Sequence, residues 1–270
     1  MIRPPFLDFR NINERFNGFN VVEPKFDGIW GAAHINGAGV QMYSRHGNPR
    51  AQWDAPGAVT NPAVIHGEFM HGSTWANERG LTGRFFVFDC TQFGGADISA
   101  KPLCERRAAA TAVVEALQDA RIEMAPQYPI EQARARWREL VIEQRFEGLV
   151  LKNTADPFGA QWARIKRRIQ VDFVCVGFRP GGGKFNQAAA SITAGAFVAG
   201  ELRQVCSIGG LCDSDRFDFW NDQAAFVGRV FRATGQRVFK SGALRHGVFD
   251  GWHQDKRAQD CTLDSILSLL

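Results

Sequence analysis

The 270-residue sequence predicts an α+β protein of two domains, on three observations. Short apolar runs rich in β-branched and aromatic residues recur between turns in the first part of the chain, which favours antiparallel sheets. Two stretches of the same part have apolar residues at helical spacing and would flank those sheets. From residue 169 onward the chain reads as short strands separated by turns, which suits a small closed β-barrel. We therefore expect a mixed domain over residues 1–168 and a barrel over 169–270, without a long linker.

The strands of the first domain begin with an expected hairpin. Gly28–Ala33 and Val40–Tyr43 flank the glycine-rich segment Asn36–Gly39, which predicts a turn at that segment. The later runs Val64–Met70 and Phe85–Cys90 are short, apolar and β-rich, as the buried strands of a central sheet are.

Two amphipathic helices are expected next, over Cys104–Ala120 and Ile130–Arg145. A strand over Glu147–Lys152 and the basic run Arg164–Arg168 follow them and end the first domain. In the second domain we expect one helix, Ser214–Val227, and strands over Val171–Phe178, Ala194–Ala199 and Leu202–Ile208.

Composition argues against several classes of protein. No run approaches the roughly 20 apolar residues of a membrane span, and no apolar stretch follows a basic cluster at the start, so we expect a cytoplasmic protein. The six cysteines are scattered without a C-x-x-C pair, which indicates free thiols rather than a zinc module or a disulfide framework. Residues 161–270 carry 15 Lys or Arg against 10 Asp or Glu, whereas residues 1–160 carry 17 against 18. This basic C-terminal part fits a polyanionic partner.

The motif with the most chemical content is Lys25-Phe26-Asp27-Gly28, because a lysine two residues before Asp-Gly is typical of an active-site lysine that attacks a nucleotide phosphate. Six further motifs follow it in order: SRHGN at 44–48, HGEF at 66–69, FVFD at 86–89, EGLVLK at 147–152, ARIKRR at 163–168 and HQDK at 253–256. With these motifs the chain resembles the small two-domain ATP-dependent DNA ligases of bacteria and phages, over essentially its whole length. The resemblance implies a nucleotidyltransferase (adenylation) domain followed by an OB-fold barrel.

The resemblance makes Lys25 the nucleophile that takes up AMP. A lysine attacks only when its amine is neutral, and its ordinary pKa is about 10.4, so the site must disfavour the ammonium form. Lys166 and Arg164 would supply positive charge beside Lys25 and would also hold the α-phosphate of ATP.

The resemblance also implies the residues that bind the nucleotide and the DNA. Phe88 would stack on adenine, and Glu23 would accept a hydrogen bond from the adenine amino group, which favours ATP over GTP. Glu68 and Glu147 would bind the ribose and a divalent cation, Mg²⁺ or Mn²⁺. Arg45 would grip the 5′-phosphate at the nick, a bidentate contact that suits a guanidinium group.

In the barrel, His253, Asp255 and Lys256 match a motif that would approach the pyrophosphate of ATP during the first step. Two positions depart from the family pattern: Trp30 and His253 stand where the family usually has arginines. Both departures remove a cation, so we expect a working but weak first step.

The sequence thus predicts an enzyme that seals 3′-OH/5′-phosphate nicks in duplex DNA, as a monomer and with ATP. Only 24 residues precede Lys25, and no four-cysteine module is present, which argues against NAD⁺ as the cofactor. Two alternatives stay open: an RNA ligase or a capping-type nucleotidyltransferase, which shares the lysine chemistry, and a nick-binding protein with weakened catalysis. Glu23 and the SRHGN segment favour the DNA ligase.

Overall fold

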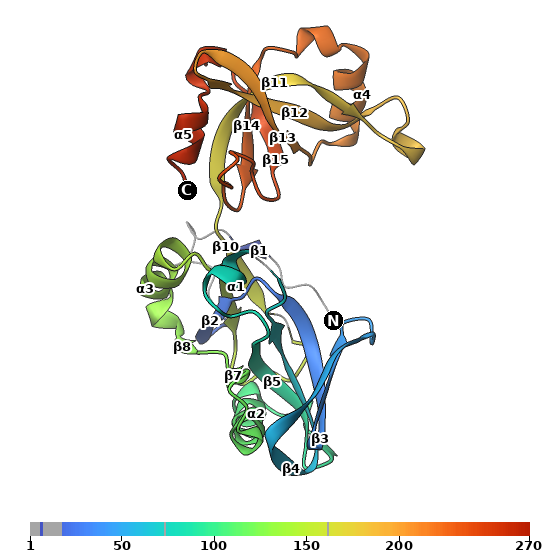
Figure 1. The fold of residues 1–270 in the computed structure, drawn as a ribbon, viewed down its shortest axis with the longest axis vertical. Coiled ribbons are helices and arrows are strands. Elements are labelled where there is room, and N and C mark those ends of the chain that lie inside the picture. Colours follow the sequence, from blue (N-terminus) through green and yellow to red (C-terminus); the bar gives the residue numbers. More distant parts are fainter. Residues whose placement is uncertain (1–5, 8–17, 73, 161) are drawn as a thin grey trace. The chain divides into compact units, whose positions relative to one another are not determined.

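A computed structural model describes residues 6–7, 18–72, 74–160 and 162–270. The chain divides into two compact units, Met1–Lys166 and Arg167–Leu270, each shown in Figure 1. The division falls close to the domain boundary that the sequence predicts. In the part of the chain that is described, no helix is long and apolar enough to cross a membrane.

The first unit contains a small sheet that ends at the predicted nucleophile. Its strands lie in the order β1 (Phe6–Leu7), β10 (Ala163–Lys166), β9 (Gly148–Lys152), β2 (Val21–Lys25) and β8 (Tyr128–Pro129). The pairings of β9 with β2 and β10 are antiparallel, and Gly148 lies opposite both Lys25 and Lys166. A side chain at Gly148 would collide with the backbone of Ile165, so this close pairing requires glycine.

A second sheet in the same unit is built on one long hairpin. The strands β3 (Ile29–Ser44), β4 (Pro49–Phe69), β5 (Phe85–Phe93) and β6 (Ala96–Asp97) pair in that order, and β7 (Ile122–Met124) adds a parallel strand to β5. Helix α2 (Leu103–Leu117) lies along this sheet in Figure 1. Its buried residues Val113 and Leu117 belong to the same core as Ile65 and Phe85 of the sheet.

Short helices complete the first unit: α1 (Thr74–Glu78), a 3₁₀-helix over Ile130–Gln132, α3 (Ala133–Arg136) and a π-helical segment over Trp137–Glu143. Leu140 and Val141 of the last segment pack with Leu149 and Leu151 of the small sheet. A separate aromatic cluster around Phe26 and Phe86, whose rings stack at 4.1 Å, lies beside the end of β2.

The second unit is one five-stranded antiparallel sheet in the order β13 (Glu201–Ile208), β12 (Ala189–Val198), β11 (Ile169–Pro180), β14 (Val230–Gly235) and β15 (Val248–Trp252). A bridge between Gly209 and Val248 joins its two edges, as in the partly open barrel of the OB-fold. The core is formed by Phe173, Phe231 and Phe219. The helices of the second unit are α4 (Asp213–Asn221), α5 (Leu263–Leu267) and 3₁₀ turns at Gly183–Phe185, Gln223–Ala225 and Ala258–Asp260.

Three details of the predicted secondary structure are wrong. The sequence predicts a turn at Asn36–Gly39, but β3 runs through this segment and the chain reverses at Ser44–Asn48. The glycines allow register shifts between Ile35 and Gly39, with Gly37 at a φ of +61°, so they distort the strand without ending it.

The second expected helix, 130–145, is not one α-helix. It divides into the 3₁₀, α and π segments given above, and the widest turns accompany the burial of the neighbouring residues Leu140 and Val141. In the second unit, α4 and the 3₁₀ turn after it replace the single helix expected over 214–227.

Candidate active site

A cavity of about 260 Å³ in the first unit brings the predicted site residues together. Six of them line it: Glu23, Lys25, Arg45, Glu68, Phe88 and Arg164. They come from both sheets and from the turn after β3, far apart in the sequence. Glu147 and Lys166 reach this cavity through their contacts with Lys25.

Lys25, Glu147 and Lys166 form one charged group at the end of the small sheet. Glu147 directly precedes Gly148, which lies opposite both lysines in the strand register. One carboxylate oxygen of Glu147 pairs with the amine of Lys25 and the other with the amine of Lys166. The backbone amide of Glu147 also donates to the carbonyl of Lys25 at 3.2 Å. The order of three strands thus sets the position of this group.

The environment of Lys166 disfavours its ammonium form. Burial lowers the pKa of Lys166, the Glu147 carboxylate opposes that effect, and the charges of Lys25 and Arg164 lower the pKa further. Lys25 therefore has a cationic neighbour, as the sequence predicts, but it is also paired with a carboxylate, which the sequence does not predict.

Glu68, on β4, is a carboxylate that burial strongly perturbs. Its Oε1 accepts a hydrogen bond from the amide of Gly28 at 3.1 Å. Desolvation raises the pKa of Glu68 to about 7, although the charge of Lys25 and the Gly28 hydrogen bond both lower it. A buried carboxylate that ionises with difficulty can gain stabilisation from a bound cation or from a hydroxyl donor.

Glu23 is the centre of a buried polar cluster, which we call the Glu23 cluster: Glu23, Arg107, Gln127 and Lys152. Glu23 is 2% exposed. Its Oε1 accepts from Arg107 at 3.0 Å and from Gln127 at 2.8 Å, and its Oε2 pairs with the Lys152 amine at 2.6 Å. Burial lowers the pKa of Lys152, whereas the Glu23 carboxylate raises it.

Phe88 lies beside this cluster in an aromatic corner. Its ring meets that of Trp162 edge to face, with centroids 5.5 Å apart. The Lys152 amine lies 4.6 Å from the Phe88 centroid and 3.9 Å from the Trp162 centroid, both within cation–π range. Phe85 and Phe86 are buried in the core, so among the first three aromatic residues of this strand Phe88 is the one that lines the cavity.

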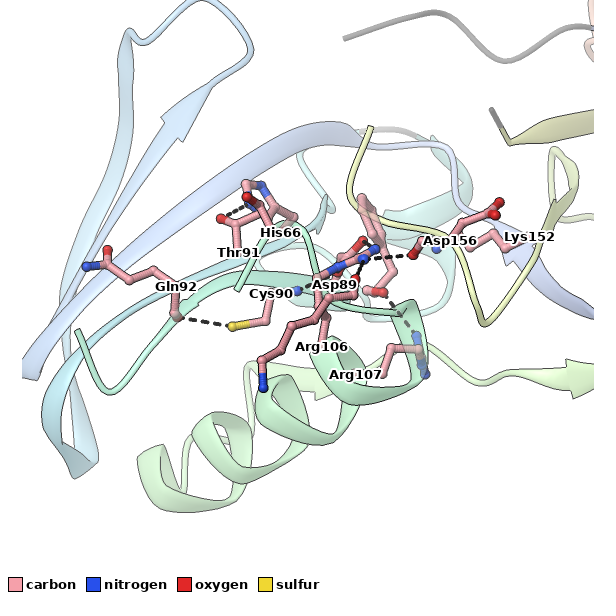
Figure 2. Close-up of polar contacts among 12 residues, drawn as sticks. His66, Asp89, Cys90, Thr91, Gln92, Arg106, Arg107, Lys152 and Asp156 are labelled. Atoms are coloured by element: carbon pink, nitrogen blue, oxygen red, sulfur yellow. Dashed lines mark hydrogen bonds and ion pairs between the residues drawn. The ribbon is translucent and has the colours of Figure 1, made fainter. Parts of the chain in front are cut away.

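The strand that carries Phe88 is anchored by a buried ion pair, shown in Figure 2. Asp89 accepts hydrogen bonds from Arg106 Nε at 2.7 Å and from Arg106 Nη2 at 2.9 Å, and both side chains are fully buried. Arg106 Nη1 also donates to the carbonyl of Asp156 at 2.8 Å. The pair ties β5, α2 and the loop after β9 together.

Trp30, at the position where the resemblance leads one to expect an arginine, lines the cavity without bringing charge. Its indole stacks on His66 with centroids 5.5 Å apart, and His66 stacks on Phe158 at 4.7 Å. Desolvation lowers the pKa of His66 to about 4, so this imidazole is neutral at physiological pH. The position therefore presents an aromatic, uncharged wall.

In the second unit, two of the three predicted motif residues contact one carboxylate, and we call this group the Asp172 cluster: Asp172, Arg232, His253 and Lys256. His253 Nε2 lies 2.9 Å from Asp172 Oδ1, and Lys256 Nζ lies 2.8 Å from Oδ2. Arg232 Nε donates to Oδ1 at 3.0 Å. Asp255, the third predicted residue, is exposed at the surface of this unit.

Sequence reasoning missed Arg107, Gln127, Trp162 and Asp172 as site residues. Lys152 was also not predicted as a site residue. It is the last residue of the EGLVLK motif, and this position could have identified it. Arg107 lies on α2 beside the exposed Glu105 and the buried Arg106, and nothing in the local pattern tells which of the two adjacent arginines faces the cavity. Among the described residues, no three His, Cys, Asp or Glu side chains are grouped to hold a metal by themselves.

Comparison with known proteins finds a family match and several similar solved structures. Residues 72–168 match the family described as ATP dependent DNA ligase domain. A solved Lig E DNA ligase is 17% identical, with a TM-score of 0.65 over 94% of this chain and 100% of that chain. The solved Pmar-Lig_Pre. is 18% identical, with a TM-score of 0.67 over 94% of this chain and 68% of that chain. No curated protein sequence matches the chain.

The two kinds of match are complementary. At these identities the solved structures establish a shared fold, and the family match adds the ligase domain, in which Phe88, Glu147 and Lys166 lie. Residues 72–168 thus match an ATP-dependent DNA ligase domain, and the chain has the fold of solved DNA ligases.

Proposed function

We propose that this ligase seals 3′-OH/5′-phosphate nicks in duplex DNA with Lys25 as its nucleophile. The observation that carries the proposal is that Lys25, Glu147 and Lys166 meet beside one cavity that Glu23 and Phe88 also line. In the first step Lys25 Nζ bonds to the α-phosphorus of ATP, and the bond from that phosphorus to the pyrophosphate breaks. AMP then passes from lysine to the 5′-phosphate of the nick. Finally, the 3′-hydroxyl attacks that phosphate and AMP leaves.

The resting contacts of Lys25 indicate what must change before the attack. A lysine paired with a carboxylate is held as an ammonium ion, which is not a nucleophile. The Lys25–Glu147 pair must therefore open, and the proton must leave, when ATP binds. Lys166 and Arg164 then hold the α-phosphate while negative charge develops on it.

The Glu23 cluster and Phe88 suit adenine. Adenine presents an amino donor next to the N1 acceptor, and Glu23 and Lys152 offer an acceptor beside a donor. Guanine presents a carbonyl oxygen and an N1–H at the same edge. It would therefore place an acceptor opposite the acceptor Glu23 and a donor opposite the donor Lys152. Stacking on Phe88 would add affinity of about 1–3 kcal/mol without distinguishing the bases.

Glu68 and Glu147 fit a divalent cation, Mg²⁺ or Mn²⁺, that takes its other ligands from phosphate and water. Both are carboxylates beside Lys25, and the raised pKa of Glu68 indicates an acid that lacks sufficient compensation for its charge. When bound, the cation would neutralise charge on the phosphates. It would also compete with Lys25 for Glu147.

We assign the DNA contacts to two places. Arg45, at the turn that ends β3, lines the cavity and is proposed to hold the 5′-phosphate of the nick. The second unit would bring His253, Asp255 and Lys256 to the pyrophosphate of ATP and contact the duplex as an OB-fold. We propose that one copy of the chain is enough for the reaction.

A single assay tests the proposal. A 5′-labelled nicked duplex in excess over the enzyme is incubated with Mg²⁺ and ATP, GTP or NAD⁺, and the products are resolved on a denaturing gel. We expect multiple turnovers with ATP alone. Lys25→Ala should abolish sealing from ATP and still seal a pre-adenylated nick, since that substrate bypasses the lysine. Sealing by Lys25→Ala from ATP at the wild-type rate would overturn the assignment of the nucleophile.

The same assay separates the alternatives. Joining of nicked RNA but not of DNA would indicate an RNA ligase. Enzyme guanylation with GTP would indicate a capping-type enzyme. Binding of the nick without adenylation or joining would indicate a nick-binding protein that has lost catalysis.

A further inference from the structure

Arg107, on the first turns of α2, contacts three residues of the cavity wall at once. Its Nη1 donates to Glu23 Oε1 at 3.0 Å and to the carbonyl of Phe88 at 3.2 Å. Its Nη2 donates to the carbonyl of Ala125 at 2.7 Å. Glu23, Phe88 and Ala125 all line the cavity, and they come from β2, β5 and the segment after β7. One guanidinium group therefore joins three otherwise separate pieces of the wall.

We propose that Arg107 is a positioning residue that sets the base selectivity of the ligase, by fixing Glu23 and Phe88 at the adenine end of the pocket. The inference rests on the proposed function, in which these two residues contact the base. Arg107 itself contacts neither the base nor the phosphates and acts through its partners.

The contacts of Glu23 show how this selection works. Arg107 and Gln127 both donate to Oε1, whereas Oε2 has Lys152 as its one partner among the described residues. A carboxylate oxygen has two lone pairs, so Oε2 retains the capacity to accept from the adenine amino group. By occupying Oε1, Arg107 turns the free acceptor toward the base and keeps it beside the Lys152 donor.

A guanidinium group is needed for this task. It carries five N–H donors in a rigid plane, and here two of its nitrogens serve three acceptors on three segments. An ammonium group is a compact charge on a flexible stem and cannot span the same acceptors in one geometry. The Arg107 side chain is also only 13% exposed, so water can replace the lost contacts poorly.

The neighbouring Arg106 provides the contrast within the same helix turn (Figure 2). Its guanidinium binds Asp89 and the carbonyl of Asp156, neither of which lines the cavity. Arg106 thus stabilises the packing of α2 against the sheet, whereas Arg107 stabilises the wall of the cavity. The two successive arginines divide these tasks because they leave the helix in different directions.

The test measures how fast the 270-residue protein forms its covalent enzyme–nucleotide adduct from two substrates. One is ATP, and the other is purine riboside triphosphate, which lacks the amino group of adenine. Wild-type protein should prefer ATP because Glu23 accepts from that amino group. We expect Arg107→Gln to raise KM for ATP about tenfold and to change kcat less than about threefold. The preference for ATP should fall about tenfold, because one charge-assisted hydrogen bond to the base is then misplaced. Arg107→Lys should lose part of the preference. Arg121→Gln, which removes an arginine that pairs with Asp119 outside the cavity, is the matched control and should change neither quantity.

A double-mutant cycle separates positioning from a merely structural role. If Arg107 acts through Glu23, Arg107→Gln should add no further loss of preference in a Glu23→Gln background. Independent, additive losses would overturn the proposal. So would an unchanged KM and preference in Arg107→Gln, or, if that variant does not fold, full preference in Arg107→Lys. A wild-type protein that forms no adduct with ATP would instead contradict the proposed function.

Discussion

The Glu23 cluster and the Asp172 cluster are built in a similar way and differ in their surroundings. Each places one carboxylate among three donors, at least two of them cationic. Glu23 and Lys152 are almost fully buried, with side chains 3% and 1% exposed. Around Asp172, by contrast, the side chains of Arg232 and Lys256 are 40% and 33% exposed.

The difference indicates which cluster can open. Removing a buried charge from its partner is costly because water cannot replace the partner, so the Glu23 cluster should behave as a permanent part of the pocket. Exposed partners are readily solvated and contribute little individually. We therefore expect the Asp172 cluster to release His253 and Lys256 more readily, for example to the pyrophosphate that the proposed first step brings to them.

The largest expected effect is that of removing the buried carboxylate. Glu23→Ala leaves Arg107 and Lys152 without their counter-ion, and we expect it to lower the free energy of unfolding by about 3–5 kcal/mol. Asp172→Ala should cost clearly less, since its partners can turn to solvent. Chemical denaturation of both variants tests the comparison, which would be wrong if the two losses were equal.

The second prediction concerns catalysis in the Asp172 cluster. Asp172→Asn keeps the shape of the side chain but removes the charge that holds His253 and Lys256. We expect kcat for enzyme adenylation to fall about tenfold, which corresponds to about 1.4 kcal/mol, while KM for ATP stays unchanged. Initial rates over a range of ATP concentrations measure both quantities. A change in KM alone would mean that this cluster acts on nucleotide binding, the role proposed for the Glu23 cluster.

The third prediction uses Glu68, a carboxylate without a cluster of cations. Its pKa in the folded protein is about 7 against an ordinary 4.5, so the folded protein keeps a proton that the unfolded chain releases in this interval. Stability should therefore fall as the pH rises from 4.5 to about 7 and then level off. Glu68→Gln removes this effect and should be more stable than wild type at pH 8, by at most about 3.5 kcal/mol, since one pKa unit is about 1.4 kcal/mol.

The measurement is denaturation of both proteins in a chelator-containing buffer at pH 4.5 and pH 8. The difference should nearly disappear at the lower pH, where Glu68 is protonated in the folded protein and half protonated in the unfolded chain. A Glu68→Gln protein that is less stable than wild type at pH 8 would show that Glu68 is well compensated. The same variant should form less enzyme–AMP, because it loses the proposed ligand for ribose and cation.

The smallest effects are expected at the two departures from the family pattern. Trp30→Arg adds a cation to the cavity wall beside neutral His66, and His253→Arg gives Asp172 a permanently charged partner. Each should raise the adenylation rate about threefold, or about 0.6 kcal/mol. Single-turnover adenylation measures it, with Arg121→Gln as a control for unrelated surface changes. An unchanged rate in both variants would show that these cations are dispensable here.

The site residues that the sequence reveals are those in ordered motifs. Lys25, Glu68 and Phe88 line one cavity, as expected, because each motif sits on a strand or at a strand end. The turn at Asn36–Gly39 was mispredicted for a local reason: the same glycines permit either a turn or a distorted strand, and long-range pairing of β3 with β4 decides between them.

The amino-acid sequence by itself determined the order of the motifs, the choice of Lys25 as the proposed nucleophile and the change from a mixed domain to a β-rich one. These properties depend on residue type and spacing along the chain. Only the tertiary structure decided that Glu147 bridges Lys25 and Lys166, that Arg107 holds Glu23, and that Asp172 holds His253 and Lys256. Each of these contacts joins segments that are distant in sequence, and hydrogen bonds between such segments follow from strand register and burial, which no local pattern encodes.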